Sequence, residues 1–286
     1  MLITTKRHGS GLGAWRMSFA APPGSLAGSV TTLWDVQGVT RYGHECILPT
    51  GHVDVLFSLA DEQYLLDADR PGRRERFSTV WVSGLQQRPL LAQSAGFSHL
   101  VGLRLTPTGA WRFFGQPLHE LTGRVLDLDL ILGSSLLELR EQLALLPDPE
   151  RRLRRLLEFA QRRLARGPAV HPCVSLAARI IDHSAGRCTI AWIVSETGVS
   201  QKHLVRKFAE QVGLSPKRFA RLRKFRHAVQ TLQSAGEPGL AGLAVDCGYF
   251  DQAHFNHDFR AFAGATPSEF LRQRLPEDVT AVMVRS

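Results

Sequence analysis

The sequence predicts an α+β fold: an amino-terminal, β-barrel-like domain with some helices, then an all-α carboxyl-terminal domain with two helix-turn-helix units joined by a long helix. Three observations indicate this. Short apolar runs separated by Gly and Pro fill residues 1 to about 130, leucines at helical spacing begin near Gly133, and one pattern repeats in the last hundred or so residues. We place the domain boundary after the Gly167-Pro168 pair, giving domains of residues 1–168 and 169–286.

Three apolar runs in the first part are predicted to be strands. They are Val53–Leu59, Thr79–Val82 and Leu100–Leu105, the last ended by Thr106-Pro107. Several short strands separated by turn signals are typical of a barrel or a sandwich, because each strand buries one face against a shared core.

Two helices are predicted before the boundary. The first is capped by Ser134 or Ser135 and continues to Leu146, where prolines interrupt the chain. The second runs from Glu150 to about Arg166 and carries seven arginines on the side opposite its leucines. We interpret these arginines as a solvated face, with a dimer contact and a DNA-facing surface as the alternatives.

The repeat consists of two copies offset by 50 residues and then, after one inserted residue, by 51. In each copy a short helix is predicted to end at a glycine, which tolerates the left-handed conformation of a tight turn, and a capping residue opens a second helix. The glycines are Gly198 and Gly248, the caps are Ser200 and Asp251, and the inward pairs are Leu204 with Phe208 and Phe255 with Phe259. A helix from Pro216 to Ser234-Ala235-Gly236 is expected to join the two units.

The outer faces of the second helices hold side chains that suit DNA. Amides and guanidinium groups bond base edges, and free backbone N–H groups at a helix start attract phosphate. The candidate DNA-binding residues are Gln201, Lys202, Arg206, Gln252, Asn256, His257 and Arg260. A plain helical repeat with a solvated outer face is the alternative.

The charge of the chain favours a polyanionic partner. The formal net charge is +9 and the isoelectric point is about 10.0. Residues 171–226 hold eleven Lys or Arg against three Asp or Glu, whereas residues 227–286 hold four against seven. Most phosphate attraction is therefore expected from the first unit and the joining helix, with Lys217, Arg218, Arg221 and Lys224 as candidates.

Compartment signals point to the cytoplasm. The four cysteines form no C-x-x-C pair and too sparse a set for a disulfide framework, so reduced thiols are expected. The amino terminus lacks the pattern of a signal peptide, and no apolar run approaches the roughly 18 residues of a membrane helix. No membrane partner is expected.

At residues 172–275 the chain resembles the AraC/XylS family of transcription regulators. The residues that carry the resemblance are Gly198-Val199-Ser200-x-x-x-Leu204-x-x-x-Phe208, Gly213-Leu214-Ser215-Pro216, Asp246-Cys247-Gly248-Tyr249-x-Asp251-Gln252-x-His254-Phe255-x-x-x-Phe259 and Gly264-Ala265-Thr266-Pro267. The resemblance implies seven helices, a double-stranded DNA partner and contact with RNA polymerase. The chain departs from the family pattern at Ile193-Val194, and at Ala253 and His257, where the family usually has Ser and Arg.

The first part resembles an uncharacterised sensor-like domain that precedes this module in some relatives, through Pro49-x-Gly51-x-x-x-Val55-x-Phe57-x-Leu59 and Val101-Gly102-x-Arg104-x-x-Pro107. The resemblance implies a cupin-like barrel, a small-molecule effector and helices that mediate homodimer contact.

The residues themselves offer little chemistry. By residue type, the candidate metal ligands are His44, Glu45 and His52. However, His52 lies eight residues after His44, and the H-x-H spacing of cupin sites is absent. No nucleophile elbow, phosphate loop or paired catalytic carboxylate is present. We therefore expect no enzyme activity, no metal site and no cofactor. A cupin-type metal-dependent enzyme domain fused to a DNA-binding module is the alternative, and a protein-interaction scaffold is a third interpretation.

Overall fold

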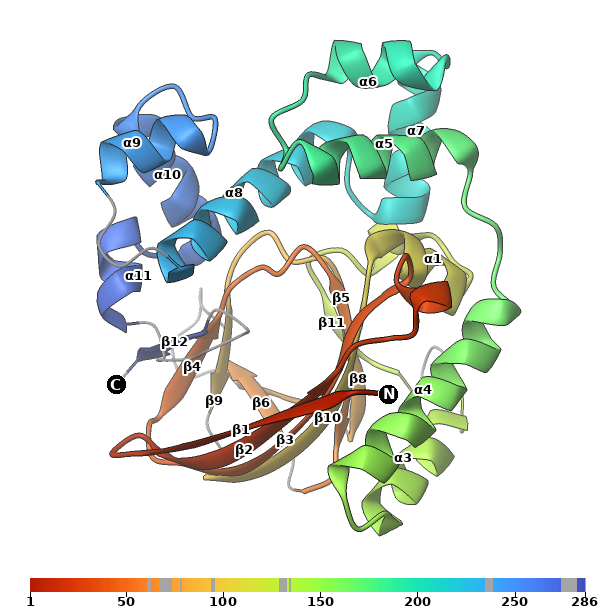
Figure 1. The fold of residues 1–286 in the computed structure, drawn as a ribbon, viewed down its shortest axis with the longest axis vertical. Coiled ribbons are helices and arrows are strands. Elements are labelled where there is room, and N and C mark those ends of the chain that lie inside the picture. Colours follow the sequence, from red (N-terminus) through yellow and green to blue (C-terminus); the bar gives the residue numbers. More distant parts are fainter. Residues whose placement is uncertain are drawn as a thin grey trace.

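The computed structural model describes residues 1–60, 63–66, 74–77, 79–93, 96–128, 133, 135–234, 239–273 and 282–285. Its architecture is α+β, with an antiparallel sheet domain followed by a helical domain, as the sequence predicts (Figure 1). Ser134, Ala235 and Gly236, named above as a cap and a helix end, lie outside the described residues.

The larger sheet contains the three predicted strands. Its seven antiparallel strands run in the order β1 (Ile3–Ser10), β2 (Gly13–Ala20), β3 (Val30–Thr40), β10 (Phe97–Leu105), β5 (Val53–Ser58), β8 (Val80–Ser83) and β11 (Val125–Asp127). Along β5, the side chains of Val53, Val55 and Phe57 are buried while Asp54 and Leu56 between them are less so. This alternation gives the sheet one inward face, as period-2 strands require.

A second sheet completes the barrel-like domain. Its strands run in the order β12 (Val282–Arg285), β4 (His44–Ile47), β9 (Leu90–Gln93), β6 (Gln63–Leu66) and β7 (Arg74–Phe77). The two sheets curve around a common interior (Figure 1). Short helical segments η1 (Gly24–Leu26) and η2 (Leu118–Glu120) and helix α1 (Pro107–Phe114) belong to the same domain.

Two helices flank the barrel: α3 (Ser135–Leu145) and α4 (Pro149–Ala165). Helix α4 packs against β3 with Leu156 and Ala160 buried. The prediction that all seven arginines form a solvated face is wrong for Arg152, which is 4% exposed and bonds the buried carboxylate of Asp35. Arg152 precedes Leu156 and Ala160 by four and eight residues, so helical geometry puts it on the buried stripe.

The carboxyl-terminal domain has the seven helices that the resemblance implies, within the described residues. They are α5 (Pro172–His183), α6 (Ile190–Thr197), α7 (Gln201–Val212), α8 (Pro216–Ser234), α9 (Leu240–Asp246), α10 (Gln252–Ala263) and α11 (Pro267–Gln273). Helix α8 runs between the two units, with α6 and α7 at one end and α9, α10 and α11 at the other (Figure 1). No described helix combines the length and apolar character needed to cross a bilayer.

One element differs from the expectation that everything past the boundary is helical. Residues Val282–Arg285 form β12, which pairs antiparallel with β4, Val282 opposite Ile47 and Arg285 opposite His44. The alternating run Val-Met-Val suits a strand, and the side chain of Met283 is fully buried. The end of the chain therefore returns to the first domain and extends its second sheet.

Other contacts hold the two domains together. The hydroxyl of Thr122 donates to the carbonyl oxygen of Gly213 at 2.9 Å, where α7 ends. The thiol of Cys46 points at the carbonyl oxygen of Ala263 at 3.9 Å, where α10 ends. Both second helices thus have their carboxyl ends against the barrel, which turns their amino-terminal ends away from it.

Candidate nucleic-acid interface

The first unit has the predicted turn. Helix α6 stops at Gly198, whose φ of 65° is left-handed and whose N–H bonds the carbonyl oxygen of Val194. Ser200 then accepts a hydrogen bond from the N–H of His203 and opens α7. Leu204 and Phe208 are completely buried, so α7 is held by one apolar side.

The second unit repeats this arrangement. Helix α9 ends at Asp246, with Cys247 as its cap, and is followed by Gly248 with φ 78°. Asp251 accepts a hydrogen bond from the N–H of His254 at 2.7 Å and opens α10. Phe255 and Phe259 are completely buried. The caps and turns therefore explain the repeat that the sequence contains.

The two helices expose the same positions. Gln201, Lys202 and Arg206 on α7 are exposed, and so are Gln252, Ala253 and His257, which lie 51 residues further along. The structure thus keeps these positions of the predicted face at the surface of both units.

One of the predicted residues is half-buried, and another is exposed but lies beside an acidic side chain. Asn256 is half-buried, like its counterpart Val205, and its Oδ1 atom is buried with no hydrogen-bond partner among the described residues. Arg260 lies on the third turn of α10, where its guanidinium is 3.7 Å from the carboxylate of Glu269 on α11. Its counterpart in the first copy is Ala209, so the repeat itself does not supply a cation there.

Aromatic contacts fix both helices to α8. The rings of Phe208 and Phe219 have centroids 5.8 Å apart, which joins α7 to the start of α8. The ring of Phe225, two turns further along α8, lies 5.2 Å from that of Phe259 and 4.9 Å from that of Phe262. Helix α8 is therefore a packed spacer between the two exposed faces rather than a loose linker.

The four basic residues of α8 that are predicted to contact phosphate differ in their protein contacts. Lys217, Arg218 and Arg221 are exposed. Arg221 bonds the buried carboxylate of Asp258, which also accepts a hydrogen bond from the hydroxyl of Tyr249, and Lys224 donates to the carbonyl oxygen of Gly248. Asp258 is thus internal to the domain and does not present its charge on the outer face of α10.

The three candidate metal ligands of the first domain do not come together in one site. Glu45 accepts a hydrogen bond from the hydroxyl of Tyr42, and Nδ1 of His52 lies 3.0 Å from the carbonyl oxygen of Thr50. Burial, reinforced by the charges of Arg104, Arg223 and Arg226, holds the pKa of His52 well below its ordinary value. Within the described ranges, His44, Glu45 and His52 form no three-ligand cluster.

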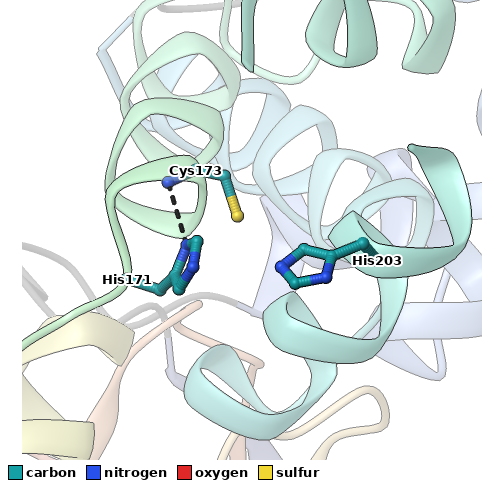
Figure 2. Close-up of side chains that lie close together, drawn as sticks. All are labelled: His171, Cys173 and His203. Atoms are coloured by element: carbon teal, nitrogen blue, oxygen red, sulfur yellow. Dashed lines mark hydrogen bonds between the residues drawn. The ribbon is translucent and has the colours of Figure 1, made fainter. Parts of the chain in front are cut away.

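A cluster that the sequence analysis missed lies in the helical domain. His171, Cys173 and His203 turn their side chains toward one another, the first two at the start of α5 and the third in the first turn of α7 (Figure 2). Burial raises the pKa of the Cys173 thiol. Only the short His-x-Cys spacing was visible in the sequence, because His203 lies 30 residues further on and reaches the other two through the packing of α5 on α7.

A cavity of about 490 Å³ lies between α1 and the end of α4. Its lining includes the rings of Phe113 and Phe159, the guanidinium-bearing side chains of Arg112, Arg162 and Arg166, and the Gly167-Pro168 pair. The cavity therefore combines an apolar wall with several cations next to the predicted domain boundary.

Two family models match the chain. Residues 193–273 match the family described as "Helix-turn-helix domain", and residues 18–127 match "Domain of unknown function (DUF6597)". The first match includes α7, α8 and α10. The chain therefore carries a helix-turn-helix domain over these residues, which confirms the prediction of a DNA-binding transcription regulator for this part.

Three solved structures illustrate what the chain is similar to. ToxT from Vibrio cholerae, in a structure with (E)-4-(8-methylnaphthalen-1-yl)but-3-enoic acid, is 10% identical with a TM-score of 0.49, covering 94% of this chain and 98% of that one. A probable AraC family transcriptional regulator from Rhodopseudomonas palustris is 29% identical with a TM-score of 0.33, covering 37% of this chain and all of that one. The C-terminal domain of AraT from Geobacillus stearothermophilus is 23% identical with a TM-score of 0.35, covering 40% and 94%.

Proposed function

We propose that this chain regulates transcription by inserting α7 and α10 into two successive major grooves of one specific DNA site. The observation that supports this most directly concerns equivalent positions of the two helices. Each helix exposes the same three positions near its amino-terminal end, and each packs into the core through an apolar pair at equivalent positions. Gln201, Lys202 and Arg206 would read one groove, and Gln252, Asn256, His257 and Arg260 the other.

The length of α8 is compatible with this spacing. Its 19 residues at about 1.5 Å each span about 28 Å, close to the roughly 34 Å between successive major grooves. A modest bend in the DNA makes up the difference. Lys217 and Arg218, exposed at the start of α8, are the cations that the proposal assigns to phosphates between the two grooves.

The proposal assigns a different role to each of the two domains. Residues 169–286 bind DNA, and residues 1–168 receive an effector or a second copy of the chain. The cavity beside Gly167-Pro168 suits a small ligand with an anionic group for the arginines and an apolar body for the phenylalanines. The proposal includes no catalytic activity, a cytoplasmic location, and contact with RNA polymerase at the promoter.

Selection from genomic DNA tests the proposal. Fragments bound by the full chain are isolated and sequenced, and the recovered site is titrated in a mobility-shift assay at one fixed salt concentration. We expect one recurring site with two contacted segments about one helical turn apart. Binding that is equal for the selected site and for shuffled DNA would reject the function. The same data show whether sites occur singly or as pairs for a homodimer.

A further inference from the structure

The cluster of His171, Cys173 and His203 has the chemistry of a transition-metal site. Each residue offers one donor atom, and the three donor atoms all lie within 4.8 Å of one another. Two imidazole nitrogens and one thiolate sulfur form a donor set that favours zinc over magnesium or calcium, which prefer oxygen. Among the described residues, no other group of three or more such side chains lies this close together.

The positions of the three residues suit an ion that enters from outside. The side chain of Cys173 is buried, whereas His171 and His203 are each half-buried. Figure 2 shows the thiol pointing between the two rings, which come from different helices. An ion reaching the imidazoles would therefore meet the thiol at the inner end of a partly open site. Protein zinc sites with three ligands commonly keep the fourth position for water.

The donor atoms need only small movements to reach the distances of a zinc site. Tetrahedral zinc bonded to nitrogen at about 2.0 Å and to sulfur at about 2.3 Å places donors about 3.3–3.6 Å apart, so the present atoms close by about 1.5 Å at most. The ring centroids of His171 and His203 are 5.4 Å apart, and rotation about the side-chain bonds brings the nitrogens together. Because α5 packs on α7, the ligands from these two helices already lie near one another although they are distant in the sequence.

One hydrogen bond must change when the ion binds. The N–H of Cys173 donates to Nδ1 of His171 at 3.3 Å, which caps α5 (Figure 2). A neutral ring that gives one nitrogen to a metal carries its proton on the other nitrogen, so this long cap bond is lost whichever nitrogen binds. The N–H of His171 keeps its own bond of 2.8 Å to the side chain of Gln211, which continues to hold the segment in place.

We propose that His171, Cys173 and His203 bind one Zn²⁺ ion that bridges the start of α5 and the first turn of α7. The ion would tie the segment that follows the domain boundary to the helix that carries Gln201, Lys202 and Arg206. Binding of the ion does not depend on the assignment of DNA contacts, because it is measured on the protein alone.

Cobalt substitution tests the site in the full chain after treatment with a chelator. A single equivalent of Co²⁺ is expected to produce the near-ultraviolet charge-transfer band of a cobalt–thiolate bond and the visible bands of a tetrahedral ion, and Zn²⁺ is expected to abolish both. Cys173→Ser should remove the charge-transfer band. The matched control is Cys188→Ser, because Cys188 is a half-buried thiol of the same domain outside the cluster and should leave the band unchanged.

A second variant covers the case in which Cys173→Ser perturbs folding. His203→Gln changes a half-buried side chain and should weaken Co²⁺ binding by at least about tenfold while the helical circular dichroism is unchanged. Equal Co²⁺ affinity in wild type, Cys173→Ser and His203→Gln would overturn the proposal, as would a Co²⁺ spectrum without a thiolate band.

Discussion

The carboxylate of Asp35 on β3 accepts a hydrogen bond of 2.5 Å from Nε of Arg152 on α4, across 117 residues of sequence. Arg152 also donates to the carbonyl oxygen of Leu146 at 2.6 Å, and the Nε2 atom of His99 lies 3.3 Å from the other oxygen of Asp35. Asp35 and Arg152 are 1% and 4% exposed. This pair fixes α4, the helix that precedes the predicted domain boundary, to the barrel.

Removing the cation should destabilise the first domain strongly. Arg152→Ala leaves a buried carboxylate without its main partner, which typically costs about 3–5 kcal/mol. The control is Arg154→Ala on the same helix, because Arg154 and its partner Glu150 are both exposed and such a pair contributes about 0–1 kcal/mol. Urea unfolding of both variants measures the difference, and similar unfolding midpoints would show that the buried pair is not a major stabilising contact.

The same pair predicts a loss of stability in acid. Burial by itself would raise the pKa of Asp35, but the side chains of His99 and Arg152 outweigh it, so the pKa lies below its ordinary value. A lowered folded-state pKa contributes stability that is present above the ordinary aspartate pKa of about 3.9 and is lost as the pH falls through the folded value. We expect the difference in unfolding free energy between wild type and Asp35→Asn to shrink from about pH 6 to about pH 3. A difference that stays constant over that range would contradict the assignment.

Two neighbouring arginines on α8 should behave differently. Arg218→Ala removes an exposed charge, so it should weaken binding to all DNA sequences alike and reduce the slope of log affinity against log salt by about 1. Arg221→Ala should instead destabilise the domain by about 1–3 kcal/mol, because Asp258 is buried and loses a charged donor. Salt titrations and urea unfolding of both variants separate the effects. A change of salt slope in Arg221→Ala alone would reverse the two assignments.

The parts of this fold that sequence predicts are those with local causes. Caps, left-handed glycines and apolar residues at helical spacing lie within a few residues of one another, so the tandem units and the bounds of α8 follow from the pattern around Ser200, Asp251 and Pro216. Those patterns also identified the exposed positions of α7 and α10, except that Asn256 is half-buried.

Relationships between distant segments have no such signal. Asp35 and Arg152, the pairing of β12 with β4, and the approach of His203 to Cys173 each depend on how whole elements pack. A basic residue in an arginine-rich helix gives no sign in sequence that its partner is a single acid on a strand more than a hundred residues earlier. For the same reason the sequence gives no sign that Arg221, a phosphate-binding candidate, also pairs with Asp258.

Arg206 provides the sharpest test of the DNA-reading face. It is exposed on α7, and removal of a side chain that contacts a base typically costs about 1–3 kcal/mol, so Arg206→Ala should weaken binding to the selected site by at least about tenfold. The preference for one base should also relax at a single position of the site. His257→Ala, at the equivalent position of α10, should cost less because an imidazole ring lacks the forked pair of N–H donors of a guanidinium group.

Mobility shifts at constant salt compare these variants with Arg154→Ala, which alters an exposed arginine of the first domain and should bind like wild type. If Arg206→Ala kept wild-type affinity and sequence preference, the first unit would not read bases through this residue.

Removal of the metal should weaken DNA binding if the ion orders α7. His203 follows Lys202 directly and lies in the first turn of α7, so a bond from the ion to His203 restrains the part of the helix that enters the groove. Restraint in the bound conformation lowers the ordering cost of binding, and couplings between two such sites commonly reach fivefold or more. We therefore expect a chelator to lower the affinity of the full chain for its selected site by roughly fivefold, and Zn²⁺ to restore it.

Cys173→Ser should already have the lower affinity and respond to neither reagent, whereas Cys188→Ser should behave like wild type. Equal affinities with and without metal, in a protein whose cobalt spectrum carries the thiolate band, would show that the ion binds at this site without controlling α7.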